Sequence, residues 1–240
     1  MHNMKKIFDL VNFKELFKGF LFLFLYMLVI PELVLLLFDI LHFDISNSTY
    51  YMLAYVFIYV ITLAMIFIGY RKTIFKEAKL YAKNLKKNFS LGLRYWFAAL
   101  AFMIITNMLI LSLAGGLSTN EEANRSMISI MPVFSVISMA FVGPFIEEVL
   151  FRKGFRNAFQ SDKVFLIFTA LLFGGAHLVS AFSLGSIWEN WAQLLYIIPY
   201  SGIGYFFGKA YIETDTIFTS VVCHILHNSL SVLLILLVGV

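Results

Sequence analysis

Long, nearly unbroken runs of apolar residues dominate the pattern of this chain. Seven of them reach roughly the 20 residues that a helix needs to cross the hydrocarbon core of a bilayer. Their approximate bounds are 19–41, 50–70, 92–115, 131–151, 164–182, 191–208 and 216–239. A spanning segment has to satisfy its own backbone hydrogen bonds, which a helix does within one segment. The pattern therefore predicts an all-α, polytopic transmembrane bundle of about seven spans.

The polar segments between these runs divide the chain into two parts. Residues 1–91 form a predicted two-span segment, and residues 92–240 form a transmembrane core that carries the polar motifs. Between them, the basic stretch from Arg71 to Lys87 mixes lysines with apolar residues. This mixture predicts an amphipathic helix on anionic lipid headgroups, with substrate docking as the alternative. The first span follows several lysines but shows no small-residue cleavage site, which favours a retained anchor over a signal peptide.

Composition supports a lipid environment. Of the 240 residues, 61% are hydrophobic and 13% are charged, whereas soluble domains carry about 25% charged residues. The single cysteine, Cys223, lies in an apolar run and excludes an internal disulfide framework. The chain is therefore expected to be an integral membrane protein with the lipid bilayer as its solvent. Its richness in Phe, Ile, Leu, Lys and Asn suggests an AT-rich genome and fits a bacterial cell membrane.

The basic residues are distributed very unevenly between the two sides of the predicted bundle. With a cytoplasmic N-terminus, seventeen of the eighteen lysines and arginines fall on the cytoplasmic side, and Arg125 alone falls on the other. This asymmetry follows the positive-inside rule and also predicts a C-terminus on the outer side. It accounts for the net charge of +4 without a nucleic-acid partner. The sequence carries no signal for an oligomeric state.

Ionisable residues inside spans cost about 2.5–3.5 kcal/mol each on insertion scales, so they need a structural or chemical reason. Glu147 and Glu148 are adjacent in the fourth span, and Arg152 follows one turn after Glu148. Residues four apart share a helix face, whereas neighbours point about 100° apart. Arg152 is therefore expected to neutralise Glu148 and to leave Glu147 free for proton chemistry. Glu32 and Asp39, in the first span, are expected to have a structural or end-of-span role.

Two further spans carry polar faces. Phe173 and His177 share a face of the fifth span, and His224 and Asn228 share a face of the last. A bundle that buries these faces together would surround one wet cavity with a carboxylate, two imidazoles and a carboxamide. Distances from the basic ends predict that this cavity lies on the cytoplasmic side. A lone membrane histidine more often makes an interhelical hydrogen bond, and His227 is expected to pack beside the site.

At these positions the sequence resembles the CPBP family of CAAX proteases and bacteriocin-processing proteins, also called Abi, which includes type II CAAX prenyl endopeptidases. The family pattern is Glu-Glu-x-x-x-Arg, then Phe-x-x-x-His, then His-x-x-x-Asn. The matching segments are Glu147-Glu148-Val-Leu-Phe-Arg152, Phe173-Gly-Gly-Ala-His177 and His224-Ile-Leu-His-Asn228. The likeness covers about residues 131–240 and includes the glycines from Gly202 to Gly208. Lys153 departs from the pattern, because family members often have a small residue there.

The resemblance implies an intramembrane endopeptidase that acts on a membrane-associated peptide or protein. By analogy with the family, Glu147 would activate a water molecule with help from His177. His224 and Asn228 would stabilise the oxyanion of the tetrahedral intermediate. The second glutamate and the arginine of the first motif would hold the site in shape.

The same residues are compatible with a zinc-dependent mechanism and with a metal-free one. Glu147, His177 and His224 form a set that can bind zinc with an open fourth position. Asn228 is a poor zinc ligand, however, and the four groups suffice for a glutamate-activated water without an ion. A mechanism that requires no cofactor is therefore favoured, with zinc as the alternative.

Two functions of other classes compete with the protease. A non-catalytic membrane scaffold of the same fold would be expected to lose motif residues, and this chain keeps them all. A proton-coupled transporter would carry polar groups along a pathway through both halves, and the first half offers few. The His-Glu-x-x-His motif of zinc proteases is absent. A pheromone, bacteriocin or CAAX-type precursor is the expected kind of substrate.

Overall fold

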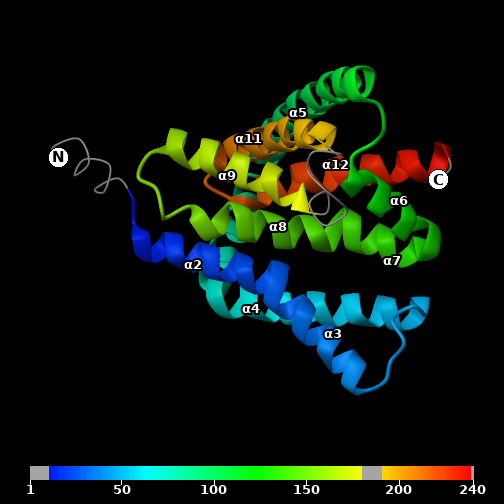
Figure 1. Ribbon diagram of the computed structural model, residues 1–240. Coiled ribbons are helices and arrows are strands. Elements are labelled where there is room, and N and C mark those ends of the chain that lie inside the picture. The colour runs from blue at the N-terminus through cyan, green and yellow to red at the C-terminus, as the bar shows by residue number, and fades with distance from the viewer. Residues whose placement is uncertain (1–10, 180–190, 239–240) are drawn as a thin grey trace, which may run out of the picture.

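The computed structural model of the chain describes residues 11–179 and 191–238. All regular elements in this part are helices, apart from one bridge between Val11 and Phe159, which confirms the all-α prediction. Figure 1 shows α8, α9, α11 and α12 between the layer formed by α2, α3 and α4 and the tilted α5. The helices are α2 (Phe13–Phe24), α3 (Ile30–Ile40), α4 (Ser48–Lys83), α5 (Leu85–Ala114), α6 (Thr119–Ile130), α7 (Pro132–Ile137), α8 (Gly143–Phe151), α9 (Asp162–Ala176), α11 (Ile197–Thr214) and α12 (Ile217–Val238).

Two long apolar segments each contain one wider, π-helical turn close to a proline. The turns are Leu25–Val29, between α2 and α3, and Ser138–Val142, between α7 and α8. Pro31 and Pro144 follow within two residues, and a proline has no N–H to donate to the carbonyl four residues earlier. A π-turn accommodates this loss without ending the helix. Each pair of helices therefore continues as a single segment.

Five helical segments of the described chain are long and apolar enough to cross a membrane. They are Phe13–Ile40, Ser48–Lys83, Leu85–Leu113, Pro132–Phe155 and Ile217–Val238. These five agree with five of the seven spans that the sequence predicts. The chain is thus an integral membrane protein with several spanning helices.

The other two predicted spans, 164–182 and 191–208, correspond to shorter or more polar helices. α9 has 15 residues, and residues 180–182 lie outside the described part. α11 has 18 residues but includes Lys209 and Glu213. Each helix buries one face, with Phe165 and Phe207 both 0% exposed, and α9 exposes apolar side chains such as Leu171 (54%) on another.

α4 is longer than a membrane crossing requires. Its 36 residues, Ser48–Lys83, correspond to about 54 Å at 1.5 Å per residue, against a hydrocarbon core of about 30 Å. No proline interrupts it. Residues 71–83 of the stretch predicted as an interfacial helix are helical but continue α4 without a break, and α5 begins at Leu85.

α9 and α11 pack closely because glycines line their contact. A Cβ atom on Gly174 would lie 2.1 Å from the Ser201 hydroxyl oxygen, and one on Gly204 would lie 3.0 Å from the Cα of Ala170. Small residues of this kind let helix backbones approach one another in membranes. The close approach brings the C-terminal end of α9, where His177 lies, against the first turn of α11.

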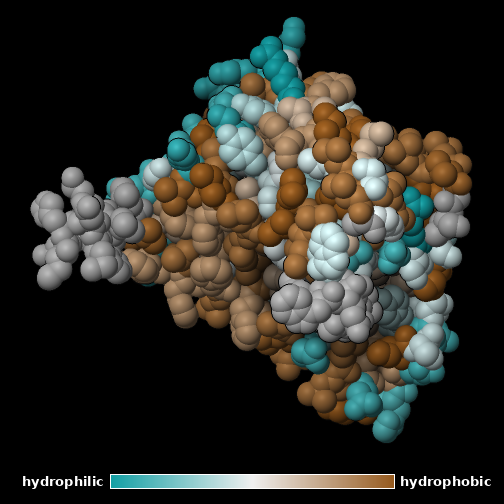
Figure 2. Space-filling model, turned by 45° about the horizontal axis from the view of Figure 1, so that its top comes forward, coloured by the Kyte–Doolittle hydropathy of each residue, from teal (hydrophilic) through white to brown (hydrophobic). Residues whose placement is uncertain are grey.

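The outer surface is largely apolar. Ile68, Leu113 and Val238 are 81%, 76% and 81% exposed, and many other large hydrophobic side chains share this exposure. Figure 2 shows apolar residues over most of the visible face, with hydrophilic residues gathered toward its margins. Apolar surface of this extent is stable in lipid and would promote aggregation in water.

Candidate active site

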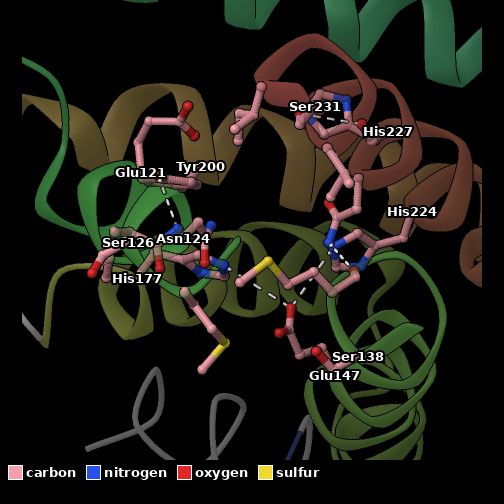
Figure 3. Close-up of a pocket in the computed structure, with 18 of the residues that line it drawn as sticks. Glu121, Asn124, Ser126, Ser138, Glu147, His177, Tyr200, His224, His227 and Ser231 are labelled. Carbon is pink, nitrogen blue, oxygen red and sulfur yellow. Dashed lines mark hydrogen bonds and ion pairs between the residues drawn. The ribbon is translucent and has the colours of Figure 1, made fainter. Parts of the chain in front are cut away.

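The three motif-bearing helices place polar side chains around one point inside the bundle. Glu147 comes from α8, His177 from the C-terminal end of α9, and His224 from α12 (Figure 3). The Glu147 Oε2 atom lies 3.7 Å from His224 Nε2 and 4.0 Å from His177 Nε2. The three side chains therefore meet at one point of the bundle.

Each imidazole is oriented by a contact of its other ring nitrogen. His177 Nδ1 lies 2.9 Å from the Phe173 carbonyl oxygen, and His224 Nδ1 lies 2.8 Å from Glu148 Oε1. Carbonyl and carboxylate oxygens only accept, so both Nδ1 atoms donate. The Nε2 atom then accepts in the neutral ring and donates in the imidazolium. The Glu147 Oε2 atom is buried and has no hydrogen-bond partner among the described residues. A single water molecule can donate to two of these acceptors, Glu147 Oε2 and a neutral His177 Nε2.

Glu148 forms the centre of a fully buried polar cluster. Its Oε1 atom lies 3.0 Å from Arg152 Nη1, and both side chains are 0% exposed. The carboxylate also accepts hydrogen bonds from His224 and from the Ser220 hydroxyl. The Arg152 guanidinium lies over the Phe173 ring, with Cζ 4.2 Å from the centroid. Glu148 is thus held on several sides, whereas its neighbour in the motif faces the cavity.

Asn228 lies one turn after His224 on α12 and lines the same cavity. Its Nδ2 atom donates to the Met139 carbonyl oxygen at 2.9 Å. Met139 belongs to the π-turn Ser138–Val142, and such turns leave carbonyl groups without their usual helical partners. One amide hydrogen of Asn228 therefore fixes the main chain that leads into α8. The second hydrogen takes no part in that bond.

A cavity of about 500 Å³ surrounds these groups. Beyond the motif residues, its lining continues along α6 through Glu121, Asn124 and Ser126, and along α12 through Ser231. Towards the C-terminal end of α8, the fully buried Arg152 side chain fills the interior of the bundle. The cavity therefore extends from the motif residues towards α6 and away from the basic end of the bundle, whereas residue counts along the helices predicted a cavity on the basic side. Residue counts give the depth of a side chain, but only packing decides where space remains.

Comparison with known protein families indicates the class of protein to which this site is similar. Residues 129–230 match the family model described as Type II CAAX prenyl endopeptidase Rce1-like. All three motifs fall inside that segment. This segment is therefore similar to the CPBP family. The resemblance drawn from the motifs is thereby confirmed.

A curated relative supports the same class of protein. The chain is 25% identical over 120 residues to "Putative membrane peptidase YdiL" of Bacillus subtilis (strain 168). The alignment covers 49% of this chain and 43% of that protein, so the chain spans less than half the length of this relative. No solved structure shows a significant match to the chain. Together the two matches support a membrane protease.

Lys153, which departs from the CPBP pattern, has a partner that the sequence analysis missed. Its ammonium group pairs with the Glu77 carboxylate, and both side chains are 10% exposed. Glu77 also accepts a hydrogen bond from the Ile217 N–H at 2.9 Å, and its main-chain oxygen accepts one from the Thr216 hydroxyl at 2.9 Å. The extension of α4 is thereby fastened to the end of α8 and to the N-terminus of α12.

Tyrosines are a second group that the sequence analysis missed. The Tyr200 ring stacks on His177, with centroids 4.6 Å apart and planes inclined by 21°. Tyr51, Tyr55 and Tyr59 form a row at i,i+4 spacing on α4 and line the cavity from the N-terminal half of the chain. The spacing is visible in the sequence, but a row of aromatic residues on a helix is equally typical of lipid contact or core packing.

The remaining candidates lie outside the immediate site. His227 is 5% exposed and its Nε2 atom lies 3.0 Å from Met103 Sδ. Glu32 and Asp39 are exposed on α3, on the side away from its buried residues. Cys223 is buried, and its thiol donates to a main-chain oxygen of α5 at 3.2 Å.

The donor set of the site has the right chemistry for zinc, because two imidazole nitrogens and a carboxylate are common zinc ligands. In the part of the chain that the structure describes, however, no group of three or more His, Cys, Asp or Glu side chains is arranged to hold a metal ion. The observed arrangement thus does not fit a preformed zinc site.

Proposed function

We propose that this chain is an intramembrane endopeptidase that hydrolyses a peptide bond of a membrane-associated peptide or protein. The observation that carries the proposal is the convergence of Glu147 Oε2 with the Nε2 atoms of His177 and His224. It occurs inside a cavity of about 500 Å³, which has room for a peptide segment. The CPBP match of residues 129–230 and the likeness to a membrane peptidase support it.

The proposed chemistry follows from what each group donates or accepts. Glu147 and the neutral His177 hold a water molecule, and Glu147 takes one of its protons as the water oxygen attacks the peptide carbonyl carbon. Donors in the cavity stabilise the oxyanion that forms. Glu147 then passes its proton to the leaving nitrogen. The carbon–nitrogen bond breaks and leaves a carboxylic acid and an amine.

His224 and Asn228 are the proposed oxyanion donors. Glu148 accepts from His224 Nδ1 at 2.8 Å, and a carboxylate in this position stabilises the imidazolium form, whose Nε2 also donates. Asn228 contributes the amide hydrogen that does not bind Met139. The proposed role of Glu148 is therefore to support His224 rather than to activate water.

A cleavage assay with matched variants tests the proposal. Wild-type protein in lipid vesicles, mixed with a library of synthetic hydrophobic peptides, is expected to produce fragments that mass spectrometry detects. Glu147→Gln keeps the volume and removes the base, and His224→Ala removes one oxyanion donor, which typically costs about 100–1,000-fold in rate. Equal cleavage by the Glu147→Gln protein would contradict the proposal. No cleavage by any of the proteins would favour the scaffold.

The same cleavage assay, carried out after treatment with a chelator, tests whether the protein requires a metal ion. Protein stripped with a strong chelator and shown to be metal-free by elemental analysis is expected to keep its cleavage rate. If cleavage disappears and stoichiometric zinc restores it, Glu147, His177 and His224 are ligands instead, and the metal-free mechanism is overturned.

A further inference from the structure

One wall of the cavity is not used by the proposed chemistry. α6 contributes Asn120, Glu121, Asn124 and Ser126 to the lining. Figure 3 shows the last three of these on the opposite side of the cavity from Glu147. Ser126 is also exposed at the surface of the protein. The cavity therefore connects Glu147 with the surface beside α6.

The interior is filled in the other direction along α8. Glu148, Phe151 and Arg152 are at most 2% exposed, and so is Ile217 at the start of α12. These side chains occupy the space between Glu147 and the ends of the helices that carry the basic residues. In the described part of the chain, the cavity thus points away from that end.

α6 lies at the end of the bundle that is poor in basic residues. Figure 1 places α6 and the end of α12 at one end, and the start of α2 and the end of α8 at the other. The basic extension of α4 lies at the second end, because Glu77 contacts Lys153 there. Among the described residues, Arg125 is the one lysine or arginine on α6 or its flanking loops. By the positive-inside rule, the α6 end faces away from the cytoplasm.

α6 is anchored as a fixed rim of the cavity. The Tyr196 hydroxyl donates to the Gly116 carbonyl oxygen at 2.8 Å, in the loop before α6. The Tyr200 hydroxyl lies 2.9 Å from the hydroxyl of Ser118, and Ser118 caps the first turn of α6. At the other end of α6, the Ser135 hydroxyl donates to the main chain of the last turn at 2.9 Å. Any ligand that passes between the surface and the motif residues therefore meets the polar face of α6.

The groups at this end suit a polypeptide main chain. The amides of Asn120 and Asn124 and the hydroxyl of Tyr55 donate and accept without a net charge. The carboxylate of Glu121 is already paired with Arg125 at 3.0 Å. Backbone N–H and C=O groups require partners of this neutral kind wherever water is excluded.

We infer that the substrate reaches Glu147 from the non-cytoplasmic side of the membrane, past α6. This inference rests on the proposed function. The substrate class is then the exported peptide segment beside the membrane anchor of a precursor, and not a prenylated cytoplasmic tail. Both the direction of the cavity and the side of the basic residues support this orientation.

Cysteine labelling tests the side of access without requiring proteolysis. Cys223 is 0% exposed, so the unmodified protein should not react and supplies the blank. Ser231→Cys introduces a thiol inside the cavity, and Lys79→Cys introduces one on the exposed basic end of α4. A small membrane-impermeant methanethiosulfonate, added to intact cells, is expected to modify Ser231→Cys protein and to reach Lys79→Cys protein only after permeabilisation. The reverse pattern would overturn the inference, whatever the cleavage assay shows.

A matched pair on α6 tests the route itself. Ser126 and Glu122 are both exposed, but only Ser126 lines the cavity. A bulky impermeant maleimide is expected to label the Ser126→Cys and Glu122→Cys proteins alike, and to abolish peptide cleavage only in the first. Unimpaired cleavage by labelled Ser126→Cys protein would overturn the route beside α6, while cleavage by the unlabelled proteins shows that the proposed function stands.

Discussion

Replacing Glu148 by glutamine tests the division of roles between the two neighbouring glutamates. The substitution keeps the volume but removes the charge that faces Arg152 at 3.0 Å, where both side chains are fully buried. Removal of one partner from a buried ion pair costs about 3–5 kcal/mol, because the other charge is left uncompensated. The same carboxylate accepts from His224 and Ser220, and an amide keeps only one oxygen for them. We therefore expect a loss of folding free energy in the upper half of that range.

Glu147→Gln is the matched control at the adjacent position. The Glu147 side chain is 22% exposed, and its nearest imidazole nitrogens are 3.7 and 4.0 Å away. No buried partner loses its counter-charge, so the free energy of unfolding is expected to change by less than about 0.5 kcal/mol. Loss of the general base is expected to lower the cleavage rate by about 10²–10⁴-fold.

A fluorogenic maleimide, added during heating, measures the unfolding temperature of both variants. Cys223 is 0% exposed in the folded protein, so its thiol reacts only when the bundle opens. For a chain of this size 1 kcal/mol corresponds to about 2–4 °C, so the Glu148→Gln protein should unfold roughly 8–20 °C below the wild type. Adding Arg152→Met should recover much of the loss, since no unpaired charge then remains. The reasoning is refuted if both single variants unfold at the wild-type temperature, or if Glu147→Gln is the less stable one.

Two further predictions concern residues outside the motifs. Tyr200→Leu removes the ring that stacks on His177 and is expected to lower kcat by up to about 100-fold with little change in KM. Tyr196→Leu is the control, because it removes a hydroxyl bound to the same loop but no contact with the His177 imidazole. Its kcat should stay close to the wild-type value. If kcat falls equally in both variants, Tyr200 contributes to stability alone. Glu77→Gln leaves Lys153 without its charge partner and should cost about 1–3 kcal/mol in the same maleimide assay, with unchanged cleavage per folded molecule; an unchanged unfolding temperature would show that the pair does not stabilise the bundle.

Local helical geometry was sufficient to predict the helices that carry the motifs and the faces on which their polar residues lie. The pairing of Glu148 with Arg152 follows from their spacing of four on one helix, and it is present in the structure. The faces of Phe173 with His177 and of His224 with Asn228 also follow from that spacing. Such pairs depend only on the 3.6-residue repeat, which every α-helix shares.

Features that depend on contacts distant in sequence were not predictable from a single chain. Glu77 and Lys153 are 76 residues apart, and the row beginning at Tyr51 lines the cavity only because α4 packs against the motif-bearing half. The direction of the cavity depends on which side chains fill the space near Arg152, and residue counting carries no such information. The length of α4 was missed because lysines after an apolar run indicate the end of the membrane core, not the end of the helix.

The π-turn before α8 connects two motifs that sequence spacing treats as independent. Such a turn inserts one residue, so every later side chain is rotated by about 100° relative to an uninterrupted helix. Glu147 comes one helical turn after Ser138–Val142 and owes its direction to this rotation. Asn228 holds the Met139 carbonyl oxygen of the same turn at 2.9 Å. The last motif therefore acts on the first through the main chain, and the geometry of the proposed base depends on a residue of another helix.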